Sequence, residues 1–76
     1  MEHITVDKSS NIQSYGYDEA TLTLEVRYRS GALWEYKNVS AASFLNLKEA
    51  ESKGRYVAQE IIRNHVGKRL EPAPPA

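Results

Sequence analysis

Residues 21–38, TLTLEVRYRSGALWEYKN, contain the clearest pattern in this sequence of 76 residues. In their first part, apolar residues alternate with polar ones, at positions Leu22, Leu24, Val26 and Tyr28. An alternation with a period of two predicts a half-buried β-strand. Ser30-Gly31 predicts a turn, and residues 32–39 then form a second strand. We therefore expect a β-hairpin on which the rest of the chain packs.

The length of the hairpin loop decides which residues face each other across the two strands. A three-residue loop Arg29-Ser30-Gly31 places glycine at the left-handed third position and pairs Val26 with Trp34 and Leu24 with Tyr36. A loop Ser30-Gly31-Ala32 instead pairs Tyr28 with Trp34. It also sets Arg27 against Glu35 and Glu25 against Lys37, which favours it electrostatically.

Turn chemistry and charge pairing thus favour different loops. A non-glycine residue in the left-handed region costs about 1–2 kcal/mol, whereas a cross-strand pair contributes only about 0.2–1 kcal/mol. We therefore favour the first loop and keep the second as the alternative. Both loops place Trp34 and Tyr36 on the apolar face, so we expect these rings in the core rather than on a base-stacking platform.

Two further strands precede the hairpin. Ile4 and Val6 alternate with polar residues and predict a short N-terminal strand or arm. Residues 12–17 predict a strand with Tyr15 and Tyr17 on one face, where they either cover a sheet edge or face a ligand.

Helical patterns fill the second half of the chain. Ser40 is a predicted N-cap for a short helix that ends around Ala50, and Ser52 is the N-cap of a second helix that reaches about Asn64. The apolar stripe of this second helix consists of Val57, Ala58, Ile61 and Ile62. The predicted fold class is α+β: an antiparallel β-meander of three main strands, with a short N-terminal fourth strand or arm, and two C-terminal helices packed on one face.

Composition limits the cellular context and the chemistry. Residues 1–70 make one small domain, and the proline-rich residues 71–76 predict a disordered tail. Without cysteine, the chain has no disulfides and no cysteine zinc site, which fits the cytoplasm. No apolar run is long enough for a membrane span, and no signal peptide is recognisable.

The charges are unevenly distributed although they sum to zero. Residues 1–30 carry an excess of acids, and residues 48–71 carry an excess of bases. A zero net charge is not typical of a dedicated polyanion binder, and mixed surface charge is ordinary. Only the local basic excess in the second half therefore points to an anionic partner.

Several short motifs together resemble one known family. They are Ser10-Asn11-Ile12, Gly16-Tyr17-Asp18, Thr21-Leu22 with Leu24-Glu25-Val26, Trp34-Glu35-Tyr36 with Val39, and Ser52-Lys53-Gly54-Arg55-Tyr56. With this spacing, residues 9–70 resemble the KTSC domain, the lysyl-tRNA synthetase C-terminal domain, in a stand-alone bacterial or phage-type form. Two positions depart from the family: Trp34 stands where tyrosine is usual, and Ser40 where a helix-starting proline is common. The resemblance implies RNA, including tRNA, as a partner.

The strongest candidate site is the start of the second helix. Free amides and the helix dipole favour an anion there, and Lys53 and Arg55 add positive charge. Tyr56 is placed to stack on a base. Further cations extend the predicted nucleic-acid contact, so the full set is Lys53, Arg55, Tyr56, Arg63, Lys68 and Arg69. A capped helix with solvated cations is the competing interpretation.

Catalysis and metal binding are not expected. Glu25 and Glu35 can face each other across the hairpin, but on an open sheet face they lack a cleft. His3, in a terminus expected to fray, and His65, on the apolar side of the second helix, belong to no metal-ligand spacing. We therefore expect a non-catalytic RNA-binding module without a cofactor. The alternative is a protein-interaction module or a homodimer that uses a sheet edge and exposed tyrosines.

Overall fold

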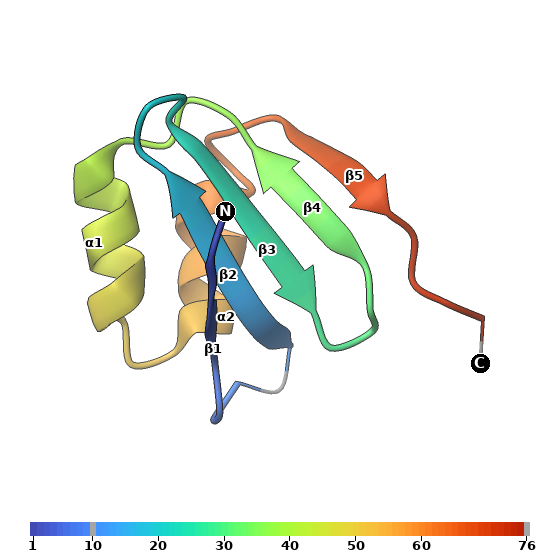
Figure 1. Cartoon of the computed structure of the whole chain (residues 1–76). Helices are drawn as coiled ribbons and strands as arrows, with labels where there is room; N and C mark the ends of the chain where they lie inside the picture. Colours follow the sequence, from blue (N-terminus) through green and yellow to red (C-terminus); the bar gives the residue numbers. More distant parts are fainter. Residues whose placement is uncertain (10, 76) are drawn as a thin grey trace.

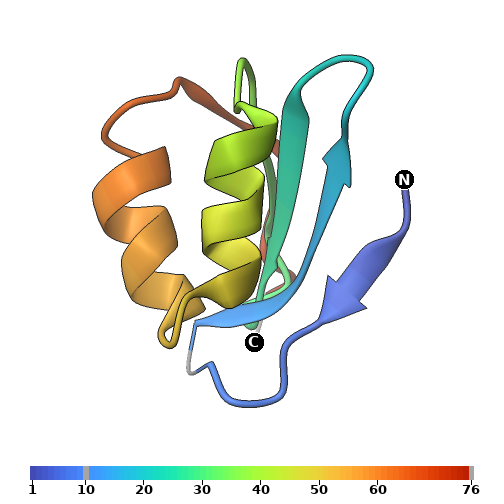
Figure 2. The same cartoon turned by 90° about the vertical axis from the view of Figure 1, so that its left-hand side faces the viewer.

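In the part of the chain that the structure describes, one five-stranded antiparallel sheet packs against two helices. The computed structural model describes residues 1–9 and 11–75, so Ser10 of the Ser10-Asn11-Ile12 motif lies outside the described residues. The strands lie in the order β1-β2-β3-β4-β5. Their bounds are β1 His3–Thr5, β2 Ile12–Asp18, β3 Thr23–Tyr28, β4 Leu33–Tyr36 and β5 Gly67–Glu71. The helices α1 (Ala41–Glu49) and α2 (Lys53–Tyr56), the latter continued by the π-helical η1 (Val57–Ile61), cover one face of the sheet (Figure 1 and Figure 2).

The hairpin of β3 and β4 has the favoured register. Val26 lies opposite Trp34 and Leu24 opposite Tyr36, as the loop Arg29-Ser30-Gly31 requires. The amide of Tyr28 donates to the carbonyl of Ala32 at 2.9 Å, which closes this loop. Gly31 has a φ of +100°, a conformation that glycine adopts without steric cost. The register of the hairpin is therefore confirmed.

The fold class is confirmed, but the number of strands and the position of the helices are not. We expected three main strands and two C-terminal helices, whereas both helices precede a fifth strand, β5. This strand pairs only with β4 and is exposed over most of its length. Because β5 buries no face of its own, its sequence has no apolar alternation to reveal it. Glu71, the first residue of the predicted tail, is the last residue of β5.

The strand β3 begins one residue later than its alternation indicates. Leu22 lies in the preceding turn with a φ of 55° and is 40% exposed. Its carbonyl accepts a hydrogen bond from the amide of Val39 at 2.9 Å, which ties this turn to the end of the hairpin. Leu22 therefore extends the apolar alternation of the sequence without belonging to the strand.

Both predicted N-caps are confirmed. Ser40 Oγ accepts from the amide of Ser43 at 3.1 Å, and Ser52 Oγ accepts from the amide of Arg55 at 3.3 Å. Of the predicted stripe on the second helix, Val57 and Ile61 are buried, whereas Ala58 and Ile62 are exposed. No helix within residues 1–9 and 11–75 has the length and apolar character to cross a membrane.

The core lies between the helices and the strands β2, β3 and β4. Ten buried residues form it: Val6, Ile12, Tyr15, Leu24, Val26, Tyr36, Val39, Leu47, Val57 and Ile61. On the α1 side, Phe44 packs edge-on against Tyr15 at 6.0 Å and stacks on Tyr17 at 4.5 Å between ring centroids. The two tyrosines of β2 therefore face α1.

Candidate nucleic-acid interface

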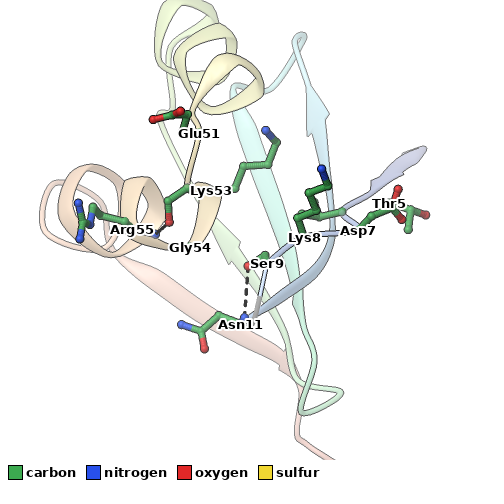
Figure 3. Close-up of a pocket in the computed structure, with 11 residues that line it drawn as sticks. Thr5, Asp7, Lys8, Ser9, Asn11, Glu51, Lys53, Gly54 and Arg55 are labelled. Carbon is green, nitrogen blue, oxygen red and sulfur yellow. Dashed lines mark hydrogen bonds between the residues drawn. The ribbon is translucent and has the colours of Figure 1, made fainter.

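The start of α2 borders a hollow of about 490 Å³, which we call the helix-start hollow. The loop after β1 forms its other wall (Figure 3). Its lining comprises Thr5, Val6, Asp7, Lys8, Ser9, Asn11, Glu51, Ser52, Lys53, Gly54 and Arg55. The hollow thus contains the motif that the sequence singled out, Ser52-Lys53-Gly54-Arg55, together with a third cation, Lys8.

The charges around the helix-start hollow are mixed. Lys8 and Lys53 reach toward the same side in Figure 3, while Arg55 points the opposite way. The carboxylates of Asp7 and Glu51 line the same hollow. Two acids beside three bases leave only a small local excess of positive charge, so the hollow is not strongly basic.

The ammonium group of Lys53 is already engaged. It donates to the carbonyls of Lys48 and Ala50 at 3.0 and 3.1 Å, and these groups lie at the end of α1. A cation that satisfies the last carbonyls of a helix complements the negative end of its dipole. Lys53 therefore joins the two helices, and Arg55 is the more available cation at this end.

Tyr56 does not face the helix-start hollow. It is partly buried and packs against the hydrophobic core. The ring of Tyr56 therefore does not line the helix-start hollow, where it was predicted to stack on a base.

A second concavity lies at the other end of the same helix, and we call it the aromatic groove. It encloses about 330 Å³ and is lined by Tyr28, Trp34, Tyr36, Ile62, His65 and Gly67. The rings of Trp34 and Tyr36 are nearly parallel, with an angle of 13° and 6.5 Å between centroids. Gly67 lies against both rings, since a Cβ there would come within 2.6 Å of Tyr36. A side chain at position 67 would therefore fill the floor of the groove.

Hydrogen bonds fix the polar atoms of the groove. The hydroxyls of Tyr28 and Tyr36 lie 2.8 Å apart. Burial, and secondarily the hydrogen bond with Tyr28, raises the pKa of Tyr36 far above its usual value. Burial also raises the pKa of Tyr28, although the hydrogen bond with Tyr36 opposes this. Both hydroxyls therefore stay protonated at neutral pH.

The ring of His65 is oriented by the backbone. Its Nδ1 lies 3.0 Å from the carbonyl oxygen of Lys37. A carbonyl oxygen only accepts, so Nδ1 carries the proton, and Nε2 of the neutral ring is left as an acceptor.

The remaining predicted cations divide between the two faces of the sheet. Arg69 lies opposite Trp34 across β4 and β5, so it shares the face of the aromatic groove, and Arg63 directly follows Ile62 in the wall of the groove. Lys68 lies opposite Glu35, on the uncovered face. Within residues 1–9 and 11–75, the ion pairs closer than 4 Å join His3 to Glu25, Arg27 to Glu71 and Lys37 to Glu35. None of them involves Arg63, Lys68 or Arg69.

The uncovered face also contains the two glutamates considered above. Glu25 and Glu35 are opposite each other, as the favoured register requires. His3 Nε2 lies 2.9 Å from Glu25, and Lys37 lies 3.7 Å from Glu35. The expectation that His3 frays was wrong, because it belongs to β1 and reaches across Gly16 to Glu25. No group of three histidine or acidic side chains able to hold a metal occurs in the described part of the chain.

Sequence reasoning missed the aromatic groove because it assigned Trp34 to the core. Trp34 does pack against the core, but it remains partly exposed. A usable signal was present: three aromatic residues, Tyr28, Trp34 and Tyr36, share one face. Two short helices cover less of a sheet face than five strands offer, so part of this aromatic surface stays open.

The profile of the KTSC domain matches residues 8–65. The chain belongs to the KTSC domain family. An uncharacterised protein from Stutzerimonas stutzeri is 40% identical over 58 residues, which are 76% of this chain and 82% of that protein. A protein from Tsukamurella paurometabola is 42% identical over 50 residues, or 66% of this chain and 75% of that protein. The crystal structure of a KTSC domain protein from Yersinia pestis superposes with a TM-score of 0.85 at 29% identity, covering 91% of this chain and 96% of that chain.

Proposed function

We propose that this KTSC domain is a non-catalytic module that binds RNA through the exposed side of its second helix and the adjacent strand β5. The observation that supports this most is the set of cations Arg55, Arg63 and Arg69. They lie on the helical side of the sheet, and none of them has a carboxylate within 4 Å among the described residues. Unpaired arginines at the edge of a concave surface are suited to phosphate contacts.

The position of the proposed contact differs from the one expected from sequence. Lys53 is occupied by the carbonyls at the end of α1, so Arg55 is the main contact at the start of the helix. Arg63 lies two turns further along the chain, and Arg69 follows on β5. An RNA strand along this side would meet cations at both ends of the helix.

Binding is tested with labelled tRNA and a short RNA by fluorescence anisotropy at low salt. We expect Arg55→Ala and Arg63→Ala to weaken binding, because each removes a phosphate contact. Lys37→Ala is the matched control, since it removes one exposed cation from the uncovered face. If no nucleic acid binds at low salt, or if Lys37→Ala weakens binding as much as the arginine variants do, the proposal is wrong.

A second candidate function rests on β5 as an open edge. This strand pairs with β4 on one side only, and a free edge offers its amides and carbonyls to a strand of another chain. The module would then bind a protein or a second copy of itself. Sedimentation of the nuclease-treated protein distinguishes this function, since a strict monomer that retains no partner contradicts it.

A further inference from the structure

The aromatic groove is the most clearly formed binding surface that the phosphate contacts above do not use. Its floor is the ring of Tyr36, which is only 3% exposed, and its sides are Trp34 and Tyr28 on the sheet and Ile62 and His65 at the helix end. Its volume of about 330 Å³ is at the lower end of the roughly 300–1,000 Å³ of small-ligand sites. A groove of this size suits one flat ring system.

The chemistry of the lining favours an aromatic ligand. No lysine, arginine or acid is among the six lining residues, so the interior is apolar. The partly exposed indole of Trp34 offers a stacking surface parallel to the ring of Tyr36 beside it. The Nε2 atom of His65 adds one acceptor, which suits an exocyclic or ring N–H of a planar heterocycle.

Two arginines that neighbour lining residues of the groove favour an aromatic ligand with an anionic periphery. Arg69 lies beside Trp34, and Arg63 follows Ile62. The nearest acids of β4 and β5, Glu35 and Glu71, are paired with Lys37 and Arg27 on the opposite face. An apolar ring slot with cations at its edge matches a base attached to a phosphate backbone.

We propose that the aromatic groove binds one unpaired nucleobase, stacked on Trp34, while Arg63 and Arg69 contact the phosphates on either side of it. This inference rests on the proposed RNA binding and names the part of the RNA that enters the groove. A base inside a duplex is stacked on its neighbours and cannot enter the groove. The domain therefore selects single-stranded RNA over a duplex.

Trp34 is the only tryptophan of the chain, so its fluorescence reports on the groove directly. The full chain is titrated with a mixed-sequence single strand of about eight nucleotides, a length within the site sizes of single-strand binders. A blunt duplex of the same sequence is titrated in parallel. Anisotropy of a dye on the RNA measures binding independently of Trp34. We expect Trp34 to be quenched by the single strand and unaffected by the duplex.

Two matched variants separate the groove from the general surface. Ile62→Glu places a carboxylate at the groove, and Leu45→Glu makes the same change on α1, away from it. The two side chains are similarly exposed, at 49% and 54%, so neither change disturbs the core. We expect Ile62→Glu to weaken binding of the single strand by about 5-fold or more, within the range for one lost stacked base. Leu45→Glu should leave it within about twofold.

Each outcome distinguishes the groove from the wider function. If both RNAs bind equally and Trp34 is silent, the groove does not take a base, although RNA binding itself stands. If no RNA binds, both proposals fall. If the Trp34 signal instead changes with protein concentration alone, the groove is a contact between copies of this chain, and the base-binding proposal is wrong.

Discussion

At the scale of single residues, the hydroxyl groups of Tyr28 and Tyr36 form a hydrogen-bonded pair. They lie 2.8 Å apart, both residues line the aromatic groove, and Tyr36 is 3% exposed. A buried hydroxyl without a partner costs about 1–3 kcal/mol, whereas replacing both partners by apolar groups is often nearly neutral. Each hydroxyl therefore depends on the other as its hydrogen-bond partner.

The variant Tyr28→Phe should lower the free energy of unfolding by about 1–2 kcal/mol, because it leaves the Tyr36 hydroxyl without its partner. The double variant with Tyr36→Phe should cost less than the sum of the two single changes. Urea unfolding of the four proteins measures this coupling. Additive effects would show that the two hydroxyls do not depend on each other.

The same pair makes stability depend on alkaline pH. In the unfolded chain both tyrosines ionise near a pKa of about 10, whereas in the fold the pKa of each is raised by burial. Above pH ~10 the folded state thus binds more protons than the unfolded state, and its stability is lost as pH rises toward the folded pKa values. We expect the urea midpoint to be constant below pH ~9 and to fall above pH ~10. The control is the Tyr28→Phe, Tyr36→Phe double variant, in which the urea midpoint should fall less. An unchanged midpoint in the unmodified protein would contradict the prediction.

At the scale of elements, β1 shows how a glycine on one strand lets another dock. Gly16 lies between His3 and Glu25 in the ladder, and its missing side chain lets the imidazole reach across β2. A Cβ at position 16 would lie 2.7 Å from the carbonyl oxygen of Glu2 and 2.8 Å from the His3 ring. In Figure 2, β1 lies on the side of the sheet away from the helices.

Gly16→Ala should therefore displace β1 and not the helices, because the new methyl group lies against Glu2 and His3 and points away from the helices. We expect faster hydrogen exchange at the amides that β1 and β2 share, such as Val6, which donates to Gln13 at 2.9 Å. Amides in β3 and β4 should keep their protection. His3→Ala is the milder control, since it removes only the imidazole ring and its contacts with Ser14 and Glu25. Unchanged exchange in β1 would mean that the strand tolerates a side chain at this position.

Lys53 links the two helices and supports a second prediction at this scale. Lys53→Ala should lower stability by about 1 kcal/mol, because two carbonyls at the end of α1 lose their donor. Arg55→Ala, at an exposed neighbouring position, should leave the thermal midpoint nearly unchanged. Calorimetry of both variants checks this. If the two variants were equally stable, the Lys53 side chain would not stabilise the end of α1.

At the scale of the whole molecule, a net charge of zero conceals a difference between paired and unpaired charges. The acids of β3 and β4 lie on the uncovered face, with Glu25 and Glu35 paired to His3 and Lys37. The arginines proposed for RNA contact lie on the helical side. Local charge rather than net charge then governs an encounter with a polyanion.

The salt dependence of RNA binding tests whether these arginines contact phosphates. For binding of single-stranded RNA, each phosphate contact adds about −0.7 to the slope of log affinity against log salt concentration. Arg69→Gln should therefore make the slope shallower by about 0.7. Trp34→Leu should weaken binding without changing the slope, since stacking releases no counterions. A slope that Arg69→Gln leaves unchanged would remove Arg69 from the interface.

Local sequence patterns were sufficient to predict most of the fold. The hairpin register followed from the loop at Gly31, and the two N-caps followed from Ser40 and Ser52, because turns and caps depend on a few adjacent residues. The family was also recognisable from short motifs and is shown by the match over residues 8–65. The sequence therefore determined the α+β class, the central hairpin and the family.

Only the tertiary structure decided the features that depend on residues far apart in the chain. The edge strand β5 was hidden because it buries no face of its own. The engagement of Lys53 depends on where α1 ends, and the aromatic groove depends on β5 bringing Gly67 beside Trp34 and Tyr36. Alternation predicted the face on which Trp34 lies, but not how far two short helices cover that face. Coverage is a property of the assembled layers, so the groove appears only when sheet and helices have packed.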